Sequence, residues 1–347
     1  MNLDNLTRDL IAIDSVTGNE DEVLKFIENY LRIEGYTHSI KSHNGGLIVG
    51  GDTKDSVVAL VGHVDTVPKS KYQENLENSK AIYGRGAVDM KSGLSVIIQT
   101  LLDFQDHDIV GIFYKGEEGA KEKNGLETLF PEITRKFKIS LGIIFEPTDN
   151  EVQLGCLGVI NAELKLEGIE AHSARPWLGE NAIYKTIPLL ENLKKLSPES
   201  ILVDELDYKE VVSVTTIYGG IAKNVIPGEV VCGINYRFAP DKTPKDAVAK
   251  ITKLLSDYGE LTIQDIAESA HPNKRNSTVQ NFIKATDAII QPKQAWTDIA
   301  RFTNSGIPAV NFGPGSPNLA HKKNEHVITS DINKCYVSIK RFFLEKT

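Results

Sequence analysis

Histidine and acidic side chains recur at the ends of apolar runs in this sequence of 347 residues. His63 and Asp65 directly follow the apolar run 57–61, and residues two apart in a strand point the same way. A metal-binding histidine needs an acceptor for its second ring nitrogen, which a nearby carboxylate supplies. An isolated pair of this kind more often marks a buried histidine with a stabilising aspartate. The other segments therefore decide whether the pair binds a metal.

Further potential ligands lie in comparable positions. Asp89 lies in a Gly-rich turn before a predicted helix, where capping of that helix is the alternative role. Glu117 and Glu118 follow a second apolar strand, and Glu146 follows a third. His321 comes after a Gly-Pro-Gly turn near the C-terminus. Because open α/β sheets place their sites at the carboxyl ends of strands, we expect these side chains to meet.

Two imidazoles and three carboxylates suit zinc, or a similar divalent ion, better than calcium or magnesium. Five side chains can hold two ions if one carboxylate bridges them. Glu117 is then left beside a ligand, and a free carboxylate next to an activated water can act as a general base. The sequence predicts a metal centre with the ligands His63, Asp89, Glu118, Glu146 and His321.

The elements that must position these residues alternate between helix and strand. Apolar periodicity predicts helices over 20–33, 91–104, 279–290 and 332–344, and strands over 47–49, 57–61, 109–114, 141–145 and 309–312. Continuous apolar strands between helices predict an α/β domain with helices on both faces of the sheet.

The central segment has a different pattern. Strands are expected over 159–167, 211–217, 229–237 and 261–266, and helices over 181–196 and 244–258. Their order, βαββαβ, is that of a ferredoxin-like unit. We therefore expect a small domain over 157–270, inserted into a larger domain formed by 1–156 and 271–347.

Composition excludes several other classes of protein. Hydrophobic residues make up 41% and charged residues 25%, which is enough for a core. The net charge is −8 without a basic block, so neither nucleic acid nor a membrane is an expected partner. No apolar run approaches the roughly 18 residues that span a bilayer. The N-terminus lacks the features of a signal peptide, and we expect a cytoplasmic protein.

Several motifs resemble those of the M20 family of metal-dependent aminoacyl hydrolases, and the resemblance covers nearly the whole chain. These motifs are GHVDTVP, GRGAVDMKSG, EEGA, FEPT, AHSARPWLGENA, NVIP and HKKNEH. The resemblance implies a zinc-exopeptidase-like catalytic domain, a mixed sheet flanked by helices, with the ferredoxin-like insertion as dimerisation or lid domain. It also implies two Zn²⁺ ions, with Co²⁺ or another divalent ion as substitutes.

The resemblance further implies a role for each site residue. One ion would take His63, Asp89 and Glu146, and the other would take His321, Asp89 and Glu118. Asp65 would orient His63, and Glu117 would move a proton from the attacking water to the leaving amine. His172 would stabilise the oxyanion in the site of a partner subunit. Substrate contacts are expected from Asn224, Arg237, Thr297 and Arg175.

The expected reaction is removal of succinate from N-succinyl-LL-2,6-diaminopimelate by a homodimer formed through the inserted domain. The motifs specify the family better than the substrate, so another N-acyl amino acid, such as acetylornithine or acetyl-lysine, stays open. A non-catalytic binding relative is the third alternative, although Glu117 and all ligands are present. Arg237, within an apolar strand, is a forked donor that a carboxylate-rich substrate would need.

The remaining histidines and the cysteines are expected to play no part in the chemistry. His326 lies close to His321 but is not expected to bind metal. The other histidines, His38, His43, His107 and His271, are expected to be exposed in polar surroundings. The three cysteines are far apart in the sequence and form no CxxC motif, so reduced, buried thiols are expected.

Overall fold

The computed structural model describes residues 2–51, 56–70 and 80–345, which divide into two compact units. The first unit comprises Met1–Leu154, Asn273–Gln291 and Arg301–Thr347, and the second comprises Gly155–Pro272 and Pro292–Ala300. The segment Pro292–Ala300, which the sequence analysis placed in the larger domain, thus groups with the second unit. The domain boundaries at 156/157 and 270/271 stay a prediction.

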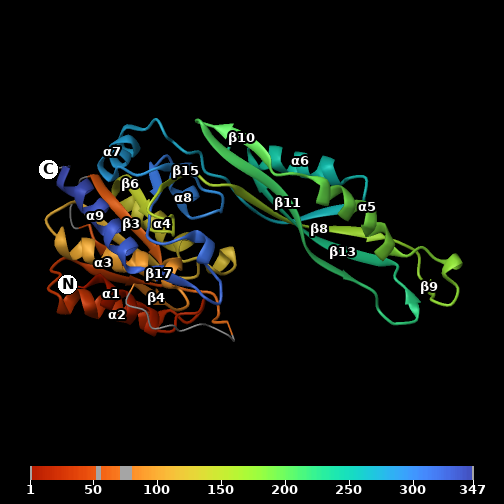
Figure 1. Cartoon of the computed structure of the whole chain (residues 1–347), viewed down its shortest axis with the longest axis horizontal. Helices are drawn as coiled ribbons and strands as arrows, with labels where there is room; N and C mark the ends of the chain where they lie inside the picture. Colours follow the sequence, from red (N-terminus) through yellow and green to blue (C-terminus); the bar gives the residue numbers. More distant parts are fainter. Residues whose placement is uncertain (1, 52–55, 71–79, 346–347) are drawn as a thin grey trace. The chain divides into compact units, whose positions relative to one another are not determined.

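The first unit is built on one mixed sheet (Figure 1), whose strand order is β1-β2-β5-β3-β6-β16-β7-β15. Its strands are β1 (Ile40–His43), β2 (Gly46–Gly50), β3 (Ser56–His63), β5 (Ile109–Tyr114), β6 (Lys138–Ile144), β7 (Val152–Leu154), β15 (Ile290–Pro292) and β16 (Ala309–Asn311). β3 pairs in parallel with both β5 and β6, and β16 pairs in parallel with β6. The predicted apolar strands therefore form the parallel centre of this sheet.

Helices cover both faces of the sheet, as predicted. They are α1 (Leu3–Ala12), α2 (Asp21–Ile33), α3 (Ser92–Asp103), α4 (Leu126–Lys136), α7 (Ser277–Thr286), α8 (Ile299–Asn304) and α9 (Thr329–Glu345). Glycine lets them approach closely: a Cβ on Gly62 would meet Leu94 and Ile97 of α3, and a Cβ on Gly142 would meet Phe302 of α8.

These two glycines point to opposite faces of the sheet. Ala59 of β3 pairs with Gly142 of β6, so their side-chain directions agree, whereas Gly62 is three residues further along β3. The face that carries α3 is therefore not the face that carries α8. The mixed α/β fold class, a mixed sheet flanked by helices, is confirmed.

One helix ends earlier than predicted. The sequence pattern extended α7 to residue 290, but the helix stops at Thr286. Asp287 adopts the left-handed conformation, with φ 51°, and its N–H bonds to the carbonyl of Ile283. This left-handed C-cap ends the helix, and the apolar residue Ile290 instead begins β15.

The second unit contains an antiparallel sheet in the order β10-β11-β13-β8-β14, with helices α5 and α6 packed on it (Figure 1). Its strands are β8 (Gly158–Glu167), β10 (Glu199–Val203), β11 (Leu206–Gly219), β13 (Glu229–Phe238) and β14 (Glu260–Ala267), and its helices are α5 (Ala182–Lys195) and α6 (Pro244–Leu255). A second, two-stranded sheet pairs β9 (Ala171–His172) with β12 (Val225–Ile226). With β10 left out, the main elements follow the βαββαβ order.

The sequence analysis missed the hairpin that joins β10 to β11. Val203 pairs with Leu206, and the two residues between them, Asp204 and Glu205, have φ values of 47° and 67°. Two left-handed residues in succession form the type I′ turn that matches strand twist. Such turns usually contain Gly or Asn, which is why the pair Asp-Glu gave no turn signal.

Glu210 of β11 is a buried carboxylate with four donors around it. Oε1 accepts from the N–H of Ala239 (2.8 Å) and pairs with Lys242 (2.9 Å), while Oε2 accepts from the hydroxyl of Tyr236 (3.0 Å) and from Lys250 (2.6 Å). Burial alone would raise the pKa of Glu210, but these donors lower it below its ordinary value. Glu210 therefore stabilises the second unit most while it is ionised.

We expect Glu210→Gln to lower the free energy of unfolding by about 2 kcal/mol at neutral pH, since hydrogen bonds to a charged group are lost. A carboxyl whose pKa is lowered by folding stabilises the protein above its unfolded pKa, and this stabilisation is lost as pH falls through the folded pKa. The difference between the two proteins should thus shrink below about pH 4. Urea unfolding of both proteins, at neutral pH and below about pH 4, measures this difference in the free energy of unfolding. Glu199→Gln is the control, because Glu199 is an exposed partner of the same Lys250; an equal loss in both variants would contradict the prediction.

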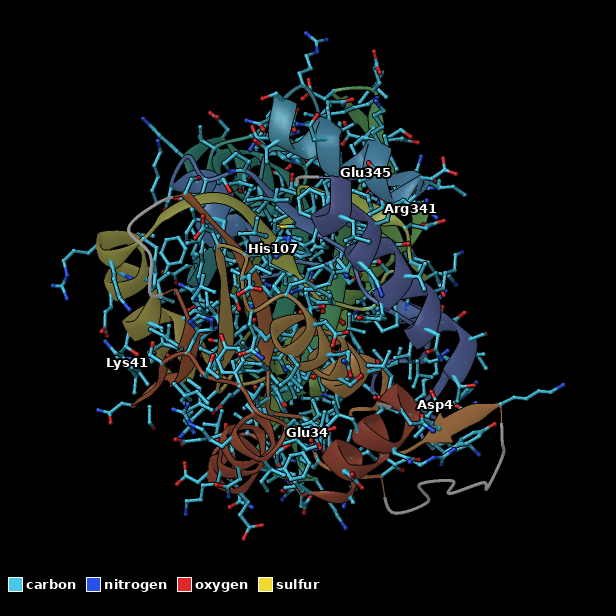
Figure 2. The ribbon with its side chains drawn as sticks, turned by 90° about the vertical axis from the view of Figure 1, so that its left-hand side faces the viewer. Asp4, Glu34, Lys41, His107, Arg341 and Glu345 are labelled. Atoms are coloured by element: carbon cyan, nitrogen blue, oxygen red, sulfur yellow. The ribbon has the colours of Figure 1, made fainter. Side chains whose placement is uncertain are left out.

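Three of the four histidines expected to be exposed differ from that prediction. His107, labelled in Figure 2, is one of them. It packs edge-on against Phe104 and Phe343, with ring centroids 5.1 and 6.0 Å away, and both of its ring nitrogens are buried. His38 and His43 are half-buried, and His271 is exposed as predicted. The prediction for His107 was wrong because one of its two apolar partners, Phe343, comes from α9, far away in the sequence.

Two remaining expectations concern cysteines and membranes. The thiols of Cys156, Cys232 and Cys335 are free and buried, as predicted. Within residues 2–51, 56–70 and 80–345, no helix has the length and apolar character to cross a membrane.

Candidate metal centre

Three neighbouring parallel strands end at the same edge of the first unit's sheet and carry the predicted ligands there. His63 is the last residue of β3, Glu117 and Glu118 follow β5 in a turn, and Glu146 lies two residues after β6. β3 lies between β5 and β6, so its histidine has carboxylates on either side. The topology alone therefore gathers these side chains at the carboxyl edge.

Asp89 lies between the two histidines. Its Oδ1 is 3.0 Å from Nε2 of His63, and its Oδ2 is 3.5 Å from Nε2 of His321. The residue belongs to an irregular turn (Ala87–Lys91) in which Asp89 and Met90 have non-helical backbone angles. No side chain caps α3, so the alternative role of Asp89 as a helix cap does not apply.

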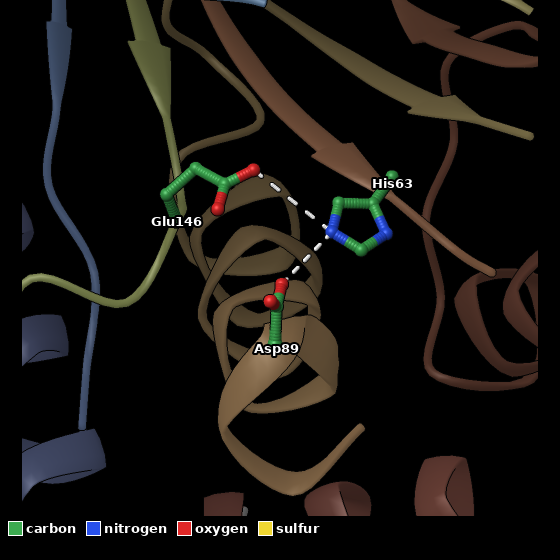
Figure 3. Close-up of side chains that lie close together, drawn as sticks. All are labelled: His63, Asp89 and Glu146. Carbon is green, nitrogen blue, oxygen red and sulfur yellow. Dashed lines mark hydrogen bonds and ion pairs between the residues drawn. The ribbon is translucent and has the colours of Figure 1, made fainter. Parts of the chain in front are cut away.

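Three groups of ligand atoms, each within 4.8 Å of one another, arise from these residues. They are His63, Asp89 and Glu146; His63, Glu117 and Glu118; and Asp89, Glu118 and His321. Figure 3 shows the first group, in which both carboxylates face the same imidazole nitrogen, with Glu146 Oε1 3.9 Å from it. In the third group, Oε1 of Glu118 lies 2.8 Å from Nε2 of His321. The donor set fits divalent ions of the zinc type.

The tautomer of His63 follows from its second ring nitrogen. Nδ1 lies 3.0 Å from the carbonyl oxygen of Asp65, which only accepts hydrogen bonds. Nδ1 is therefore a donor, and Nε2, which faces Asp89 and Glu146, is the nitrogen that would bind a metal ion in place of a proton. Asp65 was expected to orient His63, and that role stays a prediction. In the structure the backbone carbonyl of Asp65 contacts Nδ1, while its carboxylate Oδ1 is 3.5 Å from that nitrogen.

The carboxylate of Asp65 holds the neighbouring turn. Oδ1 accepts from the N–H of Glu117 (3.0 Å), and Oδ2 accepts from the N–H of Glu118 (3.1 Å) and from the hydroxyl of Thr17 (2.8 Å). Burial would raise the pKa of Asp65, but His63 and these donors lower it. One buried aspartate therefore fixes both the imidazole and the two glutamates.

The electrostatics of the edge favour a positive charge at its centre. Burial would lower the pKa of His63, but hydrogen bonds to Asp65 and Asp89 and the charge of Glu117 raise it well above its ordinary value. The hydrogen bond to Glu118 raises the pKa of His321 in the same way. Carboxylates that stabilise a proton on these nitrogens also stabilise a metal cation there.

Three buried charged residues that the sequence analysis missed lie in or beside the turn that carries Asp89. Glu325 and Arg85 form a buried ion pair of 2.6 Å beside the Asp89 turn. Lys91, also buried, donates from Nζ to the carbonyls of Leu10 (2.9 Å) and Ile13 (2.6 Å). Burial lowers the pKa of Lys91 to about 8. Arg85 and Glu325 both lie inside motifs quoted above. The charged Arg85 between two glycines was the feature of the sequence that could have indicated a buried ion pair.

The histidine nearest His321 has a different environment. His326 stacks on Tyr83, with ring centroids 4.7 Å apart, and its Nδ1 lies 2.8 Å from the carbonyl oxygen of Asn324. It is in none of the ligand groups found among the described residues.

The remaining predicted site residues lie in the second unit. His172, Arg175 and Asn224 are exposed and adjacent: Ser173 N–H donates to Asn224 O (2.9 Å), and Arg175 N–H donates to His172 O (2.8 Å). Thr297, by contrast, is only 2% exposed.

Arg237 lies on the half-buried face of β13, opposite the core. Its Nε donates to Oδ1 of Asn235 (3.0 Å), and no described residue accepts a hydrogen bond from its two terminal nitrogens. Burial lowers the pKa of Arg237. The guanidinium fork is therefore available to an anion.

Comparison with known proteins defines the class. Peptidase family M20/M25/M40 matches residues 59–345, so the chain belongs to this family of metal-dependent hydrolases. A succinyl-diaminopimelate desuccinylase from Corynebacterium glutamicum is 32% identical over 353 residues, covering 98% of this chain and 95% of its own. A Mycobacterium tuberculosis protein, 33% identical over 97% of this chain and 96% of its own, carries a provisional name for the same activity. The chain is thus a hydrolase with a small-molecule substrate, as predicted.

Solved structures agree on the fold. A tripeptidase from Staphylococcus aureus superposes with a TM-score of 0.78 at 18% identity, over 98% of this chain and 96% of that one. An M20 family metallo-carboxypeptidase from Sulfolobus solfataricus gives 0.75 at 18% identity, over 99% and 98%. At such identities the likeness concerns the fold alone.

Proposed function

We propose that this protein hydrolyses N-succinyl-LL-2,6-diaminopimelate to succinate and LL-2,6-diaminopimelate, a step of lysine and diaminopimelate biosynthesis. The observation that carries the hydrolytic part is Asp89, which presents one carboxylate oxygen to His63 and the other to His321. The desuccinylases named among the relatives, which match nearly the whole chain, support the choice of substrate.

The proposed centre holds two Zn²⁺ ions, or Co²⁺ or another divalent ion in their place. His63, Asp89 and Glu146 would hold one ion, and His321, Asp89 and Glu118 the other, in agreement with two of the three ligand groups. When bound, such ions polarise an amide carbonyl and make water a better nucleophile.

Glu117 is the proposed general base. It lies beside His63 and Glu118 and is needed by neither of the two proposed ligand sets. Its carboxylate oxygen would accept a proton from the attacking water, hold it while the amide carbonyl becomes tetrahedral, and deliver it to the leaving amine. Asp65 keeps Glu117 at this place through the hydrogen bond to its N–H.

The second unit is proposed to form the homodimer and to supply His172 as the oxyanion donor of the partner's site. Apolar side chains that remain exposed on α5 and β11 support self-association: Ile183, Tyr184, Ile187, Ile217 and Tyr218. β10 pairs with β11 only as far as Glu210, so residues 211–219 leave one edge of β11 without a strand among the described residues. An open edge beside apolar side chains fits a twofold contact.

Arg237 is proposed to bind a substrate carboxylate, with Arg175, Asn224 and Thr297 as further substrate contacts. Arg237→Lys keeps the charge but loses the two-pronged donor. We expect kcat/KM for the succinyl substrate to fall about tenfold or more, and to fall less for an analogue with one carboxylate fewer. Arg301→Lys is the matched control, because Arg301 already pairs with Glu127 at 3.0 Å. Equal losses on both substrates would make Arg237 a structural residue.

The substrate itself is tested by comparing rates of hydrolysis on three compounds, measured with the Zn²⁺-loaded protein. We expect kcat/KM to be highest for N-succinyl-LL-2,6-diaminopimelate, followed by acetylornithine and acetyl-lysine. A higher value on either acetyl compound would overturn the desuccinylase assignment while keeping the hydrolase class.

A further inference from the structure

Glu325 is fully buried, and its carboxylate contacts the backbone of the turn that carries the proposed metal ligand Asp89. Its Oε2 accepts from Nη1 of Arg85 at 2.6 Å, and its Oε1 accepts from the N–H groups of Val88 (3.2 Å) and Asp89 (3.4 Å). It belongs to none of the ligand groups in the described chain. Oε1 is therefore engaged by the turn that carries Asp89, and Oε2 is engaged by Arg85, two residues before that turn.

The same residue joins the two loops that supply Asp89 and His321. β17 (His326–Ile328) pairs with β4 (Ala81–Tyr83), and His326 is opposite Tyr83. Just beyond this ladder, the N–H of Gly84 donates to the carbonyl of Glu325 at 3.1 Å. A shift of either loop would therefore change the hydrogen bonds of Glu325.

Arg85 makes a buried carboxylate tolerable so close to Asp89. Its side chain is also buried, and it is fixed by donating from Nε to Pro68 O (3.2 Å) and from Nη1 to Lys322 O (3.5 Å). Without this cation, Glu325 would be an unpaired buried charge beside another carboxylate, which is strongly destabilising.

Asp89 needs such support because its backbone leaves the helical path. Its φ and ψ are −123° and 92°, and those of Met90 are −133° and 37°. The regular helical pattern begins only at Ser92. The direction of the Asp89 side chain is therefore set by contacts to the turn, among which the one from Glu325 reaches its N–H directly.

We propose that Glu325, neutralised by Arg85, is a positioning residue that fixes the Asp89 turn so that one carboxylate oxygen faces each imidazole. This role rests on the metal centre of the proposed function and not on its substrate. It predicts that Glu325 controls metal affinity without touching the metal.

The test is a Zn²⁺ titration of the metal-free, full-length protein against a chromophoric chelator. Substituting a residue that hydrogen-bonds a metal ligand typically weakens metal affinity by roughly 10–100-fold, and we expect Glu325→Gln to weaken Zn²⁺ binding by that factor. Both ions should be affected, because Asp89 belongs to both proposed ligand sets. Glu210→Gln is the matched control: it also removes a buried carboxylate that binds a backbone N–H and a cation, but in the second unit. This control should lose stability and keep wild-type Zn²⁺ affinity.

The outcomes separate the two proposals. Wild-type protein that takes up no Zn²⁺ would overturn the metal centre and this role with it. Wild-type protein that binds two ions, with unchanged affinity in Glu325→Gln, would overturn the positioning role alone. If Glu325→Gln does not fold, Glu325→Asp keeps the charge for Arg85 and shortens the reach to the Asp89 turn. The same loss of affinity is expected there, and wild-type affinity would overturn the role.

Discussion

Glu117→Gln should fold normally, bind metal as the wild type does, and lose roughly 10²–10⁴-fold in kcat, as expected when a general acid–base group is removed. The substitution keeps the size of the side chain and its N–H bond to Asp65, so the turn stays in place. Only the ability to accept a proton from water is lost. Steady-state kinetics and metal analysis of the same preparation measure both quantities.

The neighbouring variant Glu118→Gln is the control, because it differs by one position but removes a proposed ligand. Glu118 faces His321 at 2.8 Å, so we expect this variant to weaken one of the two ions. If Glu117→Gln turned over substrate at nearly the wild-type rate, Glu117 would not be the base. If both variants lost metal equally, Glu117 would instead be a ligand.

A mixture of two inactive proteins should regain activity if each site is shared between subunits. Glu117→Gln removes the proposed general base, and His172→Ala removes the proposed oxyanion donor. In a mixed dimer with shared sites, one site carries both changes and the other carries neither. Random exchange makes about half the dimers mixed, so about a quarter of wild-type activity should return.

Subunit exchange must be shown independently, for example by mass spectrometry of differently labelled chains. If His172 serves its own subunit, every site keeps one damaged residue and the mixture stays inactive. That result, with exchange demonstrated, would reject the shared site and leave the chemistry of Glu117 untouched. Two wild-type preparations carrying the same labels control for losses during exchange.

The sequence predicts the framework of the first unit well, because its signals are local and strong. The run 109–114 is predicted and observed with the same limits, and its neighbours differ by a few residues. Strand ends follow from these runs, so the meeting of His63, Glu118 and Glu146 follows from topology. His321 and Asp89 join them through turns, whose course a periodicity argument does not give.

What the sequence could not provide depends on contacts between distant segments. Glu325 and Arg85 are 240 positions apart and meet only once β4 and β17 have paired. The prediction for His107 failed for the same reason, since Phe343 comes from the last helix. The hairpin at Asp204 depends on two left-handed residues that carry no Gly signal.

Lys91 connects the N-terminal helix α1 to the turn that carries Asp89. Its buried ammonium, two positions from Asp89, is held by the carbonyls of Leu10 and Ile13, at the C-terminal end of α1. That end of a helix carries partial negative charge, which compensates the lysine where water cannot. Trimming the first dozen residues would leave a buried cation without its counter-dipole, next to the turn that carries Asp89. The helix α1, which is far from the proposed ligands in the sequence, thus stabilises the turn beside the metal centre. A protein without this helix should lose stability at that turn.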